Sequence, residues 1–288
     1  MNSKKIYLSL TYFIITLFIY SQEKDIQKRY LVPKDHFKEK YKPSDSLGFI
    51  IKNGDTLIRV DRFISPKGVA VPYEYKDSTF LELYKKIAFQ PIHKDSSNTK
   101  PMKYWKDDIR IYFSENMSKS VIRDVMEFAQ KIDEEVDSLK ISKVKKIEDS
   151  NYVIYYDTDY EYLNEIKNKK KSDYWISWNG KNQIERGYLR IVKSRMFSEK
   201  LTTQKIRELF FGTLGWFYLQ DDLDCDNYVA NCYSDSKHLT AIDLEILRYH
   251  YSYGICKGTS LKTFEAQHRQ CKENLRIGLP AGRFIHPD

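Results

Sequence analysis

The sequence has few histidines, and none of them are closely spaced. Six His occur among 288 residues, and no two stand four residues apart or in an H-x-H arrangement. Two His at i and i+4 lie on one helix face and are a common start of a protein zinc site. The spacing therefore excludes a zinc pair carried by one helix, and a metal site would need ligands from distant segments.

Cysteine is also scarce, and no C-x-x-C pair of the kind typical of structural zinc sites is present. The four cysteines all lie in the last quarter of the chain: Cys225, Cys232, Cys256 and Cys271. In an exported protein, four Cys indicate two disulfides. Of the three connectivities we expect the sequential one, Cys225–Cys232 with Cys256–Cys271, because it closes short loops. A zinc site made of all four is the rival interpretation.

The apolar run near the start is too short for a comfortable membrane span. Ile6–Tyr20 has fifteen residues, whereas a spanning helix needs ~20. It follows Lys4 and Lys5 and precedes Ser21, which is the layout of a secretory signal peptide. We therefore expect residues 1–21 to be removed, the mature chain to be periplasmic or secreted, and no stable membrane span to remain. An uncleaved N-terminal anchor is the alternative.

The charge pattern points away from nucleic acid. The formal net charge is +8, from 48 Lys and Arg against 40 Asp and Glu, and the lysines are scattered. The densest run, Lys167–Lys171, is typical of a solvated loop. For an exported chain, we expect an unknown protein or cell-envelope component as the partner rather than nucleic acid.

A change in composition divides the mature chain. Residues 22–100 read as an N-terminal extension with short strands, including a hairpin whose strands Phe49–Lys52 and Leu57–Phe63 flank an Asn53-Gly54 turn. A third short strand is expected at Val69–Tyr73 and a helix at Phe80–Phe89. The polar segment His93–Met102 reads as a linker, and residues 101–288 form the main domain.

The pattern of the main domain predicts an α+β fold. Apolar periodicity and capping residues give the order strand, long helix, strand, strand, helix, long loop, helix, and a further strand can precede the third one at Tyr174–Trp178. The expected ranges are Ile109–Phe113, Ser118–Leu139, Tyr152–Tyr156, Tyr174–Trp178, Gly187–Val192, Thr203–Tyr218 and Ala241–Tyr253.

Three motifs in residues 206–260 carry a resemblance to a known family. They are Leu214-Gly215-Trp216, the Asp-rich stretch Gln220–Lys237, and Leu239–Leu244 followed by Gly258-Thr259-Ser260. On these motifs the segment resembles an exported bacterial family of unknown function with a zincin-like, metzincin-related domain. The resemblance extends more loosely to about residue 104 and does not cover residues 22–100. It implies a twisted sheet, a long first helix and an active-site helix beneath the sheet.

The helix that would carry H-E-x-x-H in such enzymes has lost its zinc ligands. If Gly215 is the Gly that follows this motif, the two His positions hold Glu208 and Gly212. If Glu208 is instead the catalytic Glu, they hold Arg207 and Phe211. Neither register retains a zinc-binding side chain. We therefore expect a pseudoenzyme with no zinc cofactor, in which Glu208 is the one candidate for a catalytic residue.

Two further groups of residues are candidate binding sites. Carboxylates at alternating positions can bind Ca²⁺, so the loop after the active-site helix is a candidate calcium loop. Aromatic side chains around the third strand could form a platform for sugars or peptides. The residues concerned are Asp221, Asp222, Asp224 and Asp226 for calcium, and Tyr174, Trp175 and Trp178 for the platform.

The residues together predict a non-catalytic exported protein that binds a protein or envelope partner in the former substrate cleft. Two alternatives stay open. One is a secreted metallopeptidase with an unusual metal site. The other is a glycan-binding envelope protein that uses the aromatic platform. His250, which stands among tyrosines, is expected to be a core or surface residue rather than a ligand.

Overall fold

The computed structural model describes residues 30–33, 49–52, 55–60, 69–92, 98–166 and 169–286. The chain divides into two compact units, Met1–Gly68 with Pro287–Asp288, and Val69–His286. The expected signal peptide at residues 1–21 lies outside the described residues. Each unit is considered by itself.

The first unit contains a small antiparallel sheet with strand order β1-β3-β2. Its strands are β1 (Tyr30–Pro33), β2 (Phe49–Lys52) and β3 (Asp55–Val60). Lys52 lies opposite Asp55, so β2 and β3 form the predicted hairpin. The turn residues themselves are outside the described part of the chain.

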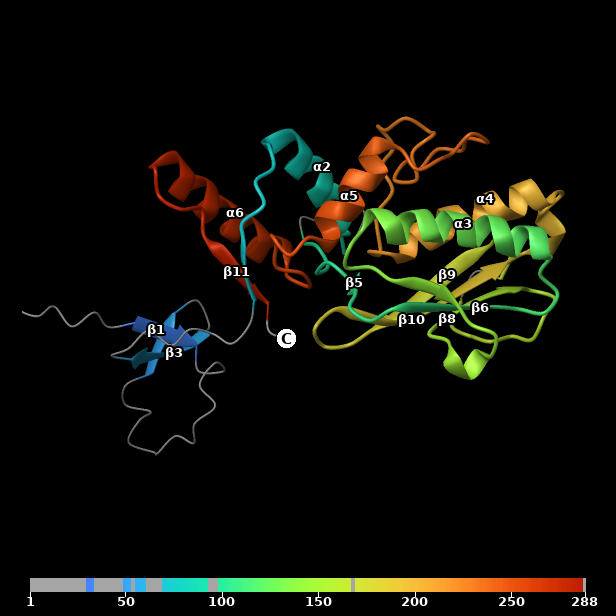
Figure 1. Ribbon diagram of the computed structural model, residues 1–288, viewed down its shortest axis with the longest axis horizontal. Coiled ribbons are helices and arrows are strands. Elements are labelled where there is room, and N and C mark those ends of the chain that lie inside the picture. The colour runs from blue at the N-terminus through green and yellow to red at the C-terminus, as the bar shows by residue number, and fades with distance from the viewer. Residues whose placement is uncertain are drawn as a thin grey trace, which may run out of the picture. The chain divides into compact units, whose positions relative to one another are not determined.

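The second unit is a mixed α and β structure, in agreement with the predicted α+β class (Figure 1). Its strands are β4 (Val69–Pro72), β5 (Tyr104–Trp105), β6 (Ile109–Phe113), β7 (Ile141–Lys143), β8 (Tyr152–Tyr156), β9 (Asp173–Trp178), β10 (Gln183–Ile191) and β11 (Arg283–His286). Its helices are α2 (Ser78–Ala88), α3 (Lys119–Glu135), α4 (Glu199–Thr213), α5 (Ala241–Tyr251) and α6 (Leu261–Arg276), with short 3-10 turns at Ile147–Asp149 and Lys193–Arg195.

The main sheet is parallel except for one edge strand. β7, β6, β8 and β10 run parallel in that order, and β5 pairs with the start of β10. Gly187 of β10 pairs with Tyr152 of β8 on one side and with Ile176 of β9 on the other. β9 is therefore an antiparallel edge strand, and no described strand pairs with its outer side. A Cβ at Gly187 would lie 2.4 Å from the Tyr152 ring, so this sheet position requires glycine.

Helices α3 and α4 lie side by side over one face of this sheet (Figure 1). Ser118 caps α3 by accepting a hydrogen bond from the backbone N–H of Val121, as its position predicts. The apolar stripe of α3, including Val125, Phe128 and Ile132, is buried against the sheet and α4. The helix ends at Glu135, four residues earlier than the pattern indicates.

Helix α4 runs over Glu199–Thr213 instead of the predicted Thr203–Tyr218. Ser198 caps its start by accepting from the N–H of Leu201. At its other end the N–H of Phe217 bonds to the carbonyl of Gly212, and Trp216 adopts a left-handed backbone with φ of 53°. A Cβ at Gly215 would lie 2.1 Å from the Phe217 ring, so the chain can turn here only with glycine.

Helix α2 belongs to the compact second unit. The ring of Tyr84 contacts that of Tyr249 at 4.8 Å, and both are part of the main core. Lys85 also forms an ion pair with Glu265 of α6 at 2.8 Å. The unit thus begins at Val69, whereas the sequence pattern placed the boundary near residue 100. Helix α6 and the pairing of β4 with β11 have no counterpart among the predicted elements.

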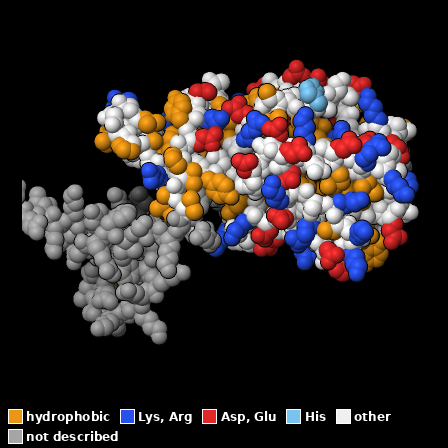
Figure 2. All heavy atoms as spheres, in the orientation of Figure 1, with side chains coloured by type: hydrophobic (Ala, Val, Ile, Leu, Met, Phe, Trp, Pro, Cys, Tyr) orange, Lys and Arg blue, Asp and Glu red, His pale blue; other side chains and the backbone are white. Residues whose placement is uncertain are grey.

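The surface of the second unit mixes both signs of charge. Lys and Arg side chains alternate with Asp and Glu over the face seen in Figure 2, with no large patch of one sign. Across the described segments, no helix is long and apolar enough to cross a membrane.

Candidate functional site

A cavity of about 240 Å³ lies over α4. Its walls come from the exposed face of α4, from Tyr174 on the edge strand β9, and from the irregular loop that follows α4. The lining residues are Tyr174, Lys205, Glu208, Leu209, Gly212, Phe217, Leu219, Tyr228, Ala230, Asn231, Cys232, Tyr233 and Lys237. The cavity therefore lies against α4 and is lined by segments that stand far apart in the sequence.

The face of α4 that borders the cavity selects one of the two registers. Lys205, Glu208 and Gly212 all line the cavity, and Glu208 and Gly212 are one turn apart on the same helix face. The positions of the other register face elsewhere, because Arg207 lies over the Phe128 ring of α3 at 5.6 Å and Phe211 is fully buried. The register that aligns Gly215 is the one whose two positions face the cavity.

Gly212 gives the cavity part of its space. A Cβ at this position would lie 3.4 Å from the Tyr174 ring and 3.5 Å from its hydroxyl oxygen. Any larger side chain would push into the cavity against Tyr174. Burial raises the pKa of Tyr174, so its hydroxyl stays protonated and can donate a hydrogen bond at neutral pH.

Glu208 is engaged by its own helix. Its carboxylate pairs with Lys205 and accepts a 3.4 Å hydrogen bond from Gln204, and its side chain is 17% exposed. Gln204 also donates to the carbonyl of Ser234 in the loop, so these contacts tie the loop to α4. Glu208, the predicted candidate for a catalytic residue, therefore lines the cavity, as does Tyr174 of the predicted aromatic platform.

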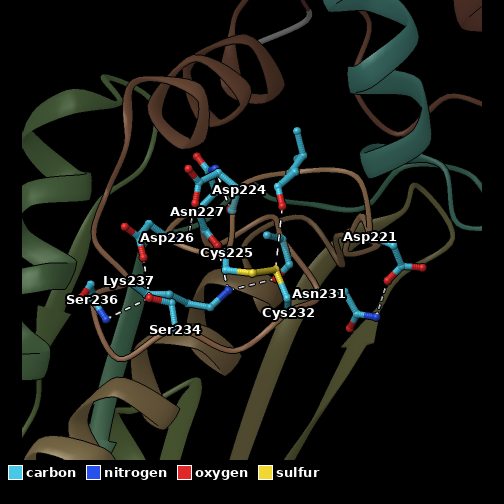
Figure 3. Close-up of a disulfide and its surroundings, with 12 residues drawn as sticks. Asp221, Asp224, Cys225, Asp226, Asn227, Asn231, Cys232, Ser234, Ser236 and Lys237 are labelled. Atoms are coloured by element: carbon cyan, nitrogen blue, oxygen red, sulfur yellow. Dashed lines mark hydrogen bonds between the residues drawn. A yellow bond between two sulfur atoms is a disulfide. The ribbon is translucent and has the colours of Figure 1, made fainter.

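One wall of the cavity is the irregular loop between α4 and α5, called the roof loop below, which several contacts hold in place. A disulfide joins Cys225 to Cys232, as predicted, and closes the loop (Figure 3). Asp243, at the start of α5, is fully buried and accepts 3.1 Å hydrogen bonds from the N–H groups of Tyr228 and Val229. The same carboxylate completes the capping box of α5. The disulfide and the hydrogen bonds to Asp243 therefore both hold this loop in place.

Lys237 of the roof loop places a partly buried positive charge beside the cavity. Its ammonium donates to the carbonyls of Asn227 and Ala230 at 2.8 and 3.0 Å, and burial lowers its pKa. An ammonium has three N–H groups, so one is left for a bound group. Burial raises the pKa of the neighbouring Tyr228 to about 12, which keeps that phenol neutral.

The aspartates of the candidate calcium loop do not converge. Asp221 accepts from Asn231 at 2.7 Å, and Asp222 pairs with Lys86 of α2 at 3.7 Å. Asp224 accepts from the N–H of Asp226, whose own carboxylate accepts from Ser234. Figure 3 shows Asp221 apart from Asp224 and Asp226. Each carboxylate serves the fold of the loop. Within the described segments, no three His, Cys, Asp or Glu side chains gather as a metal-binding group.

The aromatic residues of β9 lie on opposite faces of the sheet. Tyr174 faces α4, and Trp178 contacts Trp216, just beyond the end of α4, at 4.9 Å between ring centroids. Trp175, between them in sequence, points to the other face and contacts Tyr188 at 6.1 Å. Trp175 and Trp178 therefore do not form one platform, and this part of the prediction is corrected.

The predicted bridge between Cys256 and Cys271 is absent, since both are free thiols. The two side chains share a small cluster with Tyr73 and Phe284, and burial raises the pKa of each thiol. Cys271 is held on α6 beneath the β4–β11 ribbon. The two sulfurs therefore lie in one cluster, but no disulfide joins them.

His250 is a core residue, one of the two outcomes expected for it. Its Nε2 donates to the carbonyl of Lys103 at 2.8 Å, and Nδ1 accepts from the Tyr84 hydroxyl at 3.0 Å. Burial lowers its pKa to about 4. His268 lies in a similar position, with hydrogen bonds to the hydroxyls of Tyr73 and Tyr249. Both imidazoles are neutral structural groups.

The comparisons with known proteins add no assignment to this geometry. No family model matches the chain, and no curated protein matches it. The arguments for function therefore depend on the site alone.

Sequence reasoning missed most of the cavity wall. Lys205 could have been found, because it stands three residues before Glu208 and seven before Gly212, on the same helix face. Tyr228, Tyr233 and Lys237 come from an irregular loop, where no periodic pattern tells which side chains turn inward.

Proposed function

We propose that the chain is an exported, zincin-like binding protein that holds a segment of a protein or envelope partner at the cavity over α4. The observation that carries the proposal is the cavity itself, enclosed by α4, Tyr174 and the disulfide-closed loop. The sheet order, with an antiparallel strand beside the helix that lines the cavity, supports the zincin-like part.

The partner segment would add to the outer edge of β9, with which no described strand pairs. An exposed sheet edge offers unpaired N–H and C=O groups to an extended peptide, and a neighbouring pocket then selects one of its side chains. The cavity is smaller than the 300–1,000 Å³ usual for small-molecule sites, which suits a single side chain. Its aromatic and polar lining favours a side chain with an apolar body and a polar end.

The Lys205–Glu208 pair and Lys237 set the electrostatics of the pocket. Lys205 and Glu208 form an ion pair, whereas the Lys237 ammonium donates to two backbone carbonyls and keeps one N–H for a bound group. A carbonyl, hydroxyl or carboxylate on the inserted side chain would satisfy it. No step of bond cleavage is part of the proposal.

A selection experiment with a filled cavity tests this proposal. Random peptides are displayed and selected on the immobilised full chain, and enriched peptides are then measured against a Gly212→Leu variant. Leu at this position would occupy the space beside Tyr174. The matched control is Gly180→Leu, because a Cβ at Gly180 meets no atom within 4 Å.

The expected result is binding to the wild type and to the Gly180 variant, with at least a roughly tenfold loss for Gly212→Leu, about 1.4 kcal/mol. A Tyr233→Ala variant, altered at an exposed lining residue, should weaken the same peptides without any risk to the core. Peptides that bind all variants equally would show that the cavity is not the binding site.

A further inference from the structure

A second, cationic and aromatic site lies at the opposite end of β9 from Tyr174. The rings of Trp178 and Trp216 are 4.9 Å apart with planes at 35° to each other. The Lys103 ammonium lies 4.5 Å from the centroid of Trp178, and the Lys100 ammonium lies 4.5 Å from that of Trp216. Four side chains from three separate segments thus form one cluster, called the Trp178–Trp216 cluster below.

Among the described residues, neither lysine of this cluster forms a salt bridge with a carboxylate within 4 Å. Lys103 is only 3% exposed, and the one hydrogen bond of its ammonium goes to the side-chain oxygen of Asn182. Lysine is rarely so buried unless it is paired. Burial lowers the pKa of Lys103, and the nearby charge of Lys100 lowers it further. Within the part of the chain that the structure describes, these two neighbouring ammonium groups therefore have no counterion.

Trp216 is held in a backbone conformation that a bulky residue rarely adopts. Its φ of 53° is left-handed, at the helix-end position where glycine is usual. A side chain with a Cβ is strained in this conformation, whereas glycine is not. Strained residues of this kind gather at ligand sites. This backbone conformation places the Trp216 indole between Trp178 and Lys100. Gln90 holds the backbone there by donating a hydrogen bond to the Trp216 carbonyl.

Trp178 leaves a usable surface in the cluster. It is 39% exposed at the end of β9, so part of its indole is open to a ligand. A flat indole face packs against the C–H face of a sugar ring, and nearby ammonium groups attract an anionic substituent on that ring. Neutral sugars would use only the indole, and a small inorganic anion would use only the charges.

We propose that the Trp178–Trp216 cluster binds an acidic saccharide, with a sugar ring on Trp178 and its carboxylate or phosphate beside the partly exposed Lys100, while the buried Lys103 adds positive charge next to them. A single-stranded nucleic acid could also combine stacking and charge. The Cys225–Cys232 disulfide favours the saccharide, because such bonds are typical of oxidising extracytoplasmic compartments. The site is separate from the cavity over α4 and does not depend on the function proposed there.

Calorimetric titration of the full chain tests the proposal. The probes are trigalacturonic acid, 3′-sialyllactose, glucose-6-phosphate, the neutral maltotriose and a short oligothymidylate. The variants are Trp178→Ala and Lys100→Gln. Their matched controls are Trp175→Ala, on the other sheet face, and Lys106→Gln, an exposed lysine outside the cluster. Lys100 is partly exposed, so its variant keeps the test valid even if Trp178→Ala fails to fold.

At least one acidic saccharide should bind at millimolar concentration or tighter, and maltotriose should bind at least tenfold more weakly. Each cluster variant should lose roughly tenfold in affinity, as expected for one stacking or charge contact, while both controls keep the wild-type affinity. The proposal is overturned if no acidic saccharide binds, if maltotriose binds equally well, or if the control variants lose as much. Tighter binding of the oligothymidylate would overturn the choice of saccharide.

Discussion

Acidification should unfold this protein through two buried histidines. His250 and His268 are neutral in the folded chain, and burial lowers the pKa of each from 6.5 to about 4. In the unfolded chain both bind a proton near pH 6.5. The unfolded state therefore takes up more protons as the pH falls. Stability is complete above pH 6.5 and is lost progressively between pH 6.5 and pH 4.

The size of the effect follows from these pKa values. A difference between 6.5 and about 4 corresponds to roughly 3 kcal/mol per histidine at full protonation of the unfolded chain, and roughly 2 kcal/mol at pH 5. Domains of this kind are stable by about 5–15 kcal/mol. Loss from both histidines is thus a large share of the total. The charges of Lys257 near His250, and of Lys85 and Lys272 near His268, act in the same direction.

Urea unfolding followed by circular dichroism at several values between pH 7 and pH 5 measures this dependence. Each histidine should contribute a slope of roughly 1 kcal/mol per pH unit, so His250→Gln and His268→Gln should each remove about half of their combined slope. The exposed His238→Gln is the control and should leave the slope unchanged. Asp243, whose pKa burial raises, is present in every variant and cancels in the comparison. A wild-type stability that is flat from pH 7 to pH 5, or an unchanged slope in both variants, would refute the reasoning.

Three further outcomes are expected. Gly187→Ala should destabilise the protein by roughly 1–3 kcal/mol, because its Cβ would overlap the buried ring of Tyr152. The control Gly180→Ala should change the denaturation midpoint little, and equal midpoints for the two variants would contradict the close contact at Gly187. Glu208→Ala should lower the free energy of unfolding by less than about 1 kcal/mol, the usual contribution of an ion pair within one helix. No chelator-sensitive cleavage of unfolded proteins should be detected in the wild type or in this variant, and cleavage that disappears in the variant would contradict this. Thiol titration of the denatured, unreduced protein should find two reactive groups, Cys256 and Cys271; finding none would restore the second disulfide.

Local patterns predicted the strands with a clear apolar pattern. The strands Ile109–Phe113 and Tyr152–Tyr156 agree with the structure residue for residue, because the first alternates between buried and less buried side chains and the second is a short apolar run that is buried throughout. Helix α6 was missed although Ser260 caps it and Phe264, His268 and Cys271 recur at helical spacing. A histidine and a cysteine do not read as core residues, so the apolar stripe looked interrupted.

The boundaries and the site depended on contacts that the sequence does not display. The end of α4 is set by the left-handed Trp216, where glycine would have been the usual signal. The roof loop is held by Asp243, which accepts a hydrogen bond from the backbone N–H of Tyr228, fifteen residues earlier in the chain. Glu208 was found because it lies on a regular helix, whereas Lys237 was not because its loop has no period.

The pairing of β4 with β11 fixes when this protein can finish folding. Val71 lies opposite Phe284, more than 200 residues further along the chain. During synthesis from the N-terminus, β4 is therefore made long before its partner strand β11. Closing so long a loop is slow compared with forming local helices. A variant that lacks Arg283–His286 would deprive β4 of this partner strand and would remove Phe284 from the cluster that contains Cys271.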